Sequence, residues 1–170
     1  MPFFLKNNES LVQISFEHVL SELIASVDNC QFIQVGANDG SLNDPLRKFV
    51  IKKFLKGVMI EPQPEIFEKL KNNYEKFDLD GILFENIAID NDSGLRNLYT
   101  VKNPSNPGDS WAHAAASFDR SHIEKMLSQD SLNASDGCIE KVAVRHHAHA
   151  LIEGGVRGRE MLVEHLLRHP

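Results

Sequence analysis

Between residues 30 and 101, two kinds of hydrophobic pattern alternate along the chain. Consecutive apolar residues dominate 30–35, 57–62 and 81–89, as in buried strands. The stretches 44–55 and 64–77 instead carry apolar residues at three- and four-residue spacing, which is typical of amphipathic helices. Strands that alternate with helices predict an α/β fold with a parallel sheet flanked by helices.

Proline and turn residues support these boundaries. Asp44 precedes Pro45, and this pair predicts a helix with Asp44 as its N-cap. Pro64 opens the second helix, and 90–94 is a turn before an extended segment at 95–101. A further helix is expected to begin near Asp119, and 138–145 alternates like a strand.

The predicted organisation has three parts. Residues 10–27 show helical spacing, with Ser10 as a plausible N-cap, so 1–29 is expected to be an N-terminal helix packed on the domain. Residues 30–141 form the core. Residues 142–170 hold four Arg, five His and no Lys, against three Arg, three His and eleven Lys before them, and are predicted to be helical.

Composition narrows the class of protein. A length of 170 residues fits one domain, and a net charge of −6 disfavours a nucleic-acid partner. The two cysteines have no metal-binding spacing, which favours a reducing compartment. No run approaches the roughly 20 apolar residues of a membrane span. A cytoplasmic protein without a transmembrane segment is the expectation.

The stretch "FIQVGANDGS" at 32–41 joins a strand to a glycine turn. Ligands of parallel α/β sheets bind at the carboxyl ends of the strands, and glycine lets the backbone approach them. Gly36 and Gly40 are therefore candidates to contact a ligand. A Gly-x-x-x-Gly turn is by itself more often simple chain reversal.

Acidic and amide residues end the next two strands. Glu61, followed by Pro62, lies 25 residues after Gly36, close to the spacing of about 20 at which a carboxylate binds ribose hydroxyls. "ENIAI" ends the next strand, where three residues are candidates for an adenine pocket: Asn86, Ile87 and Ala88. An ordinary solvated strand end remains the alternative at both places.

The composition of the turn bears on the choice of cofactor. A pyrophosphate favours three glycines in G-x-G-x-x-G, but here Asn38 replaces the second and Asp39 adds a negative charge. S-adenosylmethionine has no phosphate and carries a sulfonium cation, which suits such a turn electrostatically. The cofactor-binding set is predicted to comprise Gly36, Ala37, Asn38, Asp39, Gly40, Glu61, Pro62, Asn86, Ile87 and Ala88.

Four segments together resemble the FkbM-type S-adenosylmethionine-dependent methyltransferases: "VGANDGSLNDPL", "GVMIEPQPEIFEKLKNNY", "ENIAI" and "AASFDRSHI". The resemblance covers about 31–125. It implies a Rossmann-like methyltransferase fold and O-methylation of a hydroxyl on a sugar or natural product. It also implies that Gly36–Gly40 surround the methionine part, Glu61 the ribose and Asn86–Ala88 the adenine. Ser117 and Phe118 match a family segment without an assigned role.

The end of the chain departs from the family. An acidic motif resembling I-D-x-E-G is expected after "KVAV", but "RHHAHALIEGG" stands there. This predicts a sheet truncated at the C-terminus, as a frameshift, alternative end or premature stop would give. The uncovered flank of the sheet would then be covered by a helix from 142–170 or by a second copy in a homo-oligomer.

Histidines supply the remaining candidate chemistry. His113 and His122 are weighed as the general base for methyl transfer, with His113 the candidate and Asp39 and Asp44 as alternatives. His146 and His149 would share an ion only on a helix, and no further ligand completes a set, so no metal is predicted.

The function expected is methyl transfer to a small-molecule or saccharide acceptor. One alternative is a non-catalytic nucleotide-binding or interaction remnant of the fold. Another is a dinucleotide-dependent oxidoreductase.

Overall fold

A computed structural model describes residues 3–7, 10–42, 44–53, 55–102, 115–129 and 139–148. The chain divides into two compact units. The first comprises 1–61 and 65–85, and the second comprises 62–64 and 86–170. Each unit is described by itself.

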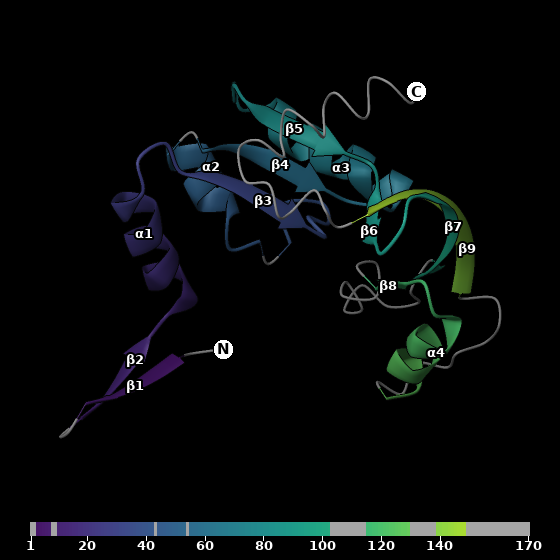
Figure 1. The fold of residues 1–170 in the computed structure, drawn as a ribbon, viewed down its shortest axis with the longest axis horizontal. Helices are drawn as coiled ribbons and strands as arrows, with labels where there is room; N and C mark the ends of the chain where they lie inside the picture. The colour runs from purple at the N-terminus through teal and green to yellow at the C-terminus, as the bar shows by residue number, and fades with distance from the viewer. Residues whose placement is uncertain are drawn as a thin grey trace. The chain divides into compact units, whose positions relative to one another are not determined.

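A three-stranded parallel sheet forms the centre of the first unit (Figure 1). Its order is β3-β4-β5, with β3 at Gln31–Val35, β4 at Lys56–Ile60 and β5 at Ile82–Glu85. In register, Val35 lies opposite Ile60, and Ile60 lies opposite Glu85. The carboxyl ends of all three strands therefore meet at one edge, as the sequence predicts.

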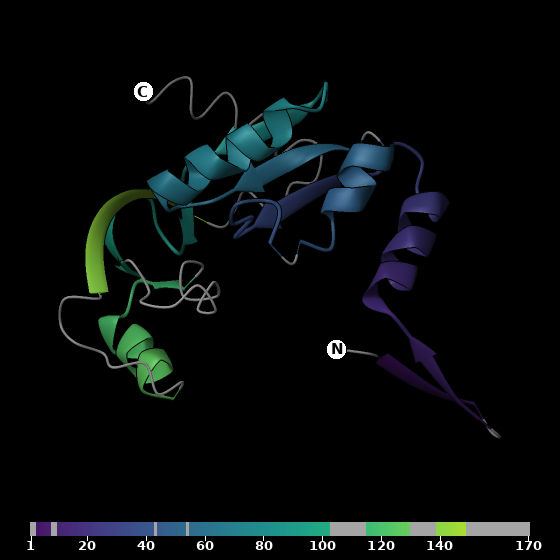
Figure 2. The same ribbon diagram turned by 180° about the vertical axis from the view of Figure 1, so that it is seen from behind.

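Helices α2 (Arg47–Lys53) and α3 (Pro64–Glu75) cover one face of this sheet. Figure 2 shows α3 in front of the strands when the molecule is seen from behind. The core on this face contains Val50 of α2, Met59 of β4, and Leu70 and Tyr74 of α3. The predicted helix opened by Pro64 is confirmed, and its apolar spacing is what places Leu70 and Tyr74 on the sheet.

The start of α2 differs slightly from the prediction. The carboxylate of Asp44 accepts the N–H of Leu46 at 2.9 Å, so it satisfies a donor at the helix start. The helix itself begins at Arg47, two residues after Pro45.

The prediction of one helix over 10–27 is wrong in its first third. Residues Ser10–Ile14 form β2, which pairs antiparallel with β1 (Phe3–Asn7) in a hairpin. Helix α1 covers only Phe16–Ser26, and its N-cap is Ser15, whose hydroxyl accepts the His18 N–H at 3.1 Å. A short apolar run is compatible with both a helix and a strand, and here the pairing with β1 makes Ser10–Ile14 a strand.

A four-stranded sheet organises the second unit. Its order is β6-β9-β7-β8, with bounds Ala88–Asp90, Ile139–Ala148, Gly94–Val101 and Ala116–Ser117 respectively. Strand β9 is parallel to β6 and antiparallel to β7, and β7 is antiparallel to β8. Helix α4 (Arg120–Gln129) contributes Ile123 and Leu127 to a core with Val101.

Two predictions in this unit require correction. The single strand expected at 81–89 is divided between β5, which pairs with β4, and β6, which pairs with β9. Residues 142–148 belong to β9 and are not helical, so helical spacing does not apply to His146. Pairing with β7 over 139–146 and with β6 over 146–148 satisfies the β9 backbone as a strand. The remainder of the segment from 149 lies outside the described residues.

Part of the β3 surface is apolar and open. Ile33 and Val35 are 45% and 53% exposed, whereas Val58 and Ile60 on β4 are buried. Among the described strands, β3 pairs only with β4 and so ends the parallel sheet. The truncated sheet and its incompletely covered flank stay predictions. The homo-oligomer remains a prediction.

Candidate functional site

The chain from Gly36 to Gly40 leaves β3 as a tight turn. Gly36, Asn38 and Gly40 have positive φ values of 71°, 51° and 65°. The left-handed region is open to glycine, and asparagine is among the residues that tolerate it best. Two glycines with an asparagine between them therefore let the chain turn sharply at the end of β3.

The two glycines have different surroundings. A Cβ at Gly36 would meet no atom within 4 Å, so open space lies beside this backbone. A Cβ at Gly40 would lie 2.5 Å from both Leu70 Cδ1 and Tyr74 Cε2 of α3. Gly36 thus leaves room for a ligand, whereas Gly40 allows close packing of the turn on α3. Ala37, between them, is 2% exposed and belongs to the core.

Glu61 connects the turn to the neighbouring strand. It follows β4 directly and is 3% exposed. One of its carboxylate oxygens accepts the Asn38 N–H at 2.9 Å, and its own N–H donates to the Glu85 carbonyl at 3.0 Å. The sequence placed this carboxylate and the turn at adjacent strand ends, and the structure brings them into a hydrogen bond.

Every backbone N–H from Gly36 to Leu42 donates within the protein. Gly36 and Ala37 donate to the Ile60 carbonyl, and Asn38 donates to Glu61. The other four N–H groups donate to three acceptors within the turn: Asp39 to Asn38 Oδ1, Gly40 to the Ala37 carbonyl, and both Ser41 and Leu42 to Asp39 Oδ1. A phosphate cradle needs N–H groups that point at the ligand, and in this turn they are engaged internally.

Asp39 is ionised at the rim of this turn. Partial burial opposes ionisation, but hydrogen bonds from the Leu42 and Ser41 amides and the Ser41 hydroxyl outweigh it, together with the charge of Arg47. These interactions hold the pKa of Asp39 below its ordinary value. The turn therefore carries an ionised carboxylate, with the Arg47 cation close by.

A second carboxylate at this edge was not singled out from the sequence. Glu85 ends β5 opposite Ile60, and burial raises its pKa. Because it lies one residue out of register with Glu61, strand alternation directs its side chain to the other face of the sheet. Its position at the end of an apolar strand was the signal available in the sequence.

Asn86, Ile87 and Ala88 belong to the second unit. Ile87 and Ala88 are buried, and Ala88 packs with Leu98 and Val144. Core packing thus accounts for Ala88 without a ligand, and the adenine-binding role of all three residues stays a prediction. The role of Pro62, assigned to the same unit, stays a prediction too.

The candidate bases His113 and His122 and the Ser117–Phe118 segment follow the cofactor turn in the chain. His113 lies outside the described residues. His122, on α4, is exposed, and Ser117 accepts the Asp119 N–H through its hydroxyl at 3.0 Å. Within the ranges that the structure describes, no group of three or more His, Cys, Asp or Glu side chains could hold a metal ion.

The sequence profile of the Methyltransferase FkbM domain matches residues 34–146. The chain belongs to the FkbM methyltransferase family. The matched region begins in β3, contains the glycine turn and Glu61, and ends in β9. The resemblance seen in the four sequence segments is thereby confirmed. No curated protein and no solved structure matches the chain.

Membership in the FkbM family fits the mixed α/β architecture with its three-stranded parallel sheet. None of the helices in the described part of the chain is long and apolar enough to cross a membrane.

Proposed function

We propose that this chain binds S-adenosylmethionine at the Gly36–Gly40 turn and transfers its methyl group to a hydroxyl of a small molecule or saccharide. Family membership supports the methyltransferase class. The observation that carries the choice of cofactor is the internal use of all seven N–H groups from Gly36 to Leu42. A pyrophosphate needs such donors, and S-adenosylmethionine does not.

The residues of the turn fit this cofactor in two further respects. The open space beside Gly36 lets a ligand approach the backbone. The charge of Asp39 suits a ligand with a sulfonium and an α-amino group. Glu61, buried at the end of β4, is proposed to accept hydrogen bonds from the ribose hydroxyls.

When bound, S-adenosylmethionine supplies an electrophilic methyl group. The chain's own residues would hold that group in line with an acceptor oxygen, and positioning of this kind accounts for much of the rate in such a displacement. The acceptor's proton must pass to a base, for which His113 remains the candidate.

Isothermal titration calorimetry with S-adenosylhomocysteine and with NADH tests the proposal. We expect heat from the first ligand and none from the second. Glu61→Gln should weaken the binding of S-adenosylhomocysteine about tenfold or more, because a charged acceptor at two hydroxyls is lost while an oxygen for the Asn38 N–H is retained. Glu65→Gln, an exposed residue on α3, is the matched control and should bind like wild type.

Binding of NADH alone would reject the proposal and favour the dinucleotide-dependent oxidoreductase. Binding of S-adenosylhomocysteine without methyl transfer to any hydroxyl acceptor would favour a non-catalytic remnant of the fold. Equal affinity of wild type and Glu61→Gln would reject the ribose role of Glu61.

A further inference from the structure

Two carbonyl oxygens of the glycine turn are held by side chains from the helices of the first unit. The guanidinium of Arg47, the first residue of α2, donates to the Gly40 carbonyl through Nη1. The side-chain amide of Asn73, on α3, donates to the Asp39 carbonyl at 2.9 Å. Side chains of both α2 and α3 therefore hydrogen-bond to the backbone of the turn.

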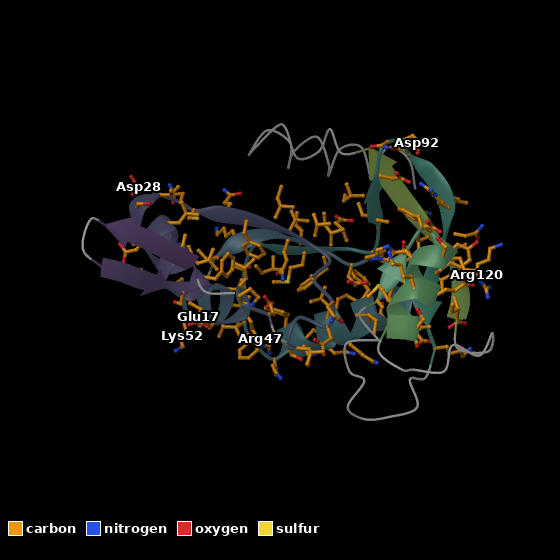
Figure 3. All side chains as sticks on the ribbon, turned by 90° about the horizontal axis from the view of Figure 1, so that it is seen from below. Glu17, Asp28, Arg47, Lys52, Asp92 and Arg120 are labelled. Carbon is orange, nitrogen blue, oxygen red and sulfur yellow. The ribbon has the colours of Figure 1, made fainter. Side chains whose placement is uncertain are left out.

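Arg47 is itself held in place on several sides. Its Nη2 donates to the Asn73 carbonyl at 3.2 Å, and its guanidinium lies 4.9 Å and 5.5 Å from the ring centroids of Tyr74 and Phe77. The Asn73 carbonyl belongs to the last turn of α3, where carbonyls lack partners within the helix and a cation is favourable. Arg47, labelled in Figure 3, thus joins the first turn of α2, the end of α3 and the glycine turn.

We infer that Arg47 and Asn73 are positioning residues, which hold the Gly36–Gly40 turn in its ligand-binding shape through the Gly40 and Asp39 carbonyls. The identity of the ligand in this inference, S-adenosylmethionine, rests on the proposed function. The helices hold the turn through these two carbonyls, and the space beside Gly36 in the same turn stays open. Neither residue touches the cofactor in this account, and both act through the turn.

Amide hydrogen exchange in the ligand-free full chain tests the inference first. In Asn73→Ala and in Arg47→Lys, which keeps the charge but loses the planar fork, we expect exchange at Gly40, Ser41 and Leu42 to accelerate about five- to tenfold, as loss of one hydrogen bond implies. Exchange at Met59, in the middle of β4, should be unchanged. Asn72→Ala, an exposed neighbour on the same helix, is the matched control and should exchange like wild type.

Calorimetry with S-adenosylhomocysteine tests the second half of the inference. Asn73→Ala and Arg47→Lys should each weaken binding about fivefold or more, and Asn72→Ala should not. Unchanged exchange in both variants, or equal acceleration at Met59 and at the turn, would overturn the positioning role. Absence of heat with wild type would overturn the proposed function and the link to the cofactor, while the exchange data would still decide whether the turn is held.

Discussion

Gly40 combines a positive φ with close contact to α3, since a Cβ there would lie 2.5 Å from Leu70 Cδ1 and from Tyr74 Cε2. Gly36 has the positive φ without the contact. The same residue type at two positions of one turn therefore meets two different constraints. At Gly40 the constraint is close packing against α3. At Gly36 the constraint is the space that a ligand would occupy.

Alanine substitutions separate these constraints. Gly40→Ala should lower the free energy of unfolding by more than about 2 kcal/mol, because left-handed strain adds to overpacking. Gly36→Ala should cost only about 1–2 kcal/mol, from the backbone alone, but should weaken S-adenosylhomocysteine binding. Urea denaturation measures the first effect and calorimetry the second. Equal losses of stability would contradict the assignment of open space to Gly36.

The charge of Asp39 predicts a pH dependence of stability. The pKa of Asp39 lies below its ordinary value of 3.8, so ionised Asp39 stabilises the folded state. This contribution is fully present above the unfolded pKa and is lost as the pH falls through the lower folded pKa. The difference in free energy of unfolding between wild type and Asp39→Asn should therefore be constant at neutral pH and shrink below about pH 4.

Denaturant titrations from pH 7 to pH 2.5 would measure this difference. Asn is the suitable replacement because its oxygen can still accept the Ser41 and Leu42 amides. A difference that does not vary over this range would show that the charge of Asp39 adds nothing to the turn.

Elements with a single strong period were the ones that could be predicted from the sequence. Strand β4 is buried on both faces and α3 has apolar residues at helical spacing, so each pattern admits one interpretation. Ser10–Ile14 fits both a helix and a strand, and only its pairing with β1 decides between them. The break between β5 and β6 was hidden for a related reason, because the two strands join different sheets.

The candidate site was predictable where it depends on strand ends. Neighbouring parallel strands bring the turn and Glu61 to one edge, and the hydrogen bond from the Asn38 N–H follows. Arg47 and Asn73 could not be predicted in this way. Their contacts with the turn span 7 and 34 residues along the chain and depend on how α2 and α3 pack on the sheet.

At the scale of the whole molecule, the family match from 34 to 146 includes parts of both compact units. Of the residues in the proposed cofactor site, the turn and Glu61 both lie in the first unit. The proposal rests on these residues, because hydrogen bonds at one edge of the parallel sheet join them. An adenine-binding role of Asn86–Ala88, in the second unit, is a separate prediction.

Mapping of amide chemical shifts in the ¹⁵N-labelled full chain during titration with S-adenosylhomocysteine tests the central claim most directly. The account predicts saturable shifts that are largest for Gly36, Asn38, Asp39 and Glu61, with NADH at the same concentration leaving these signals in place. Shifts confined to residues far from the turn along β4 and α3, or no shifts at all, would contradict it.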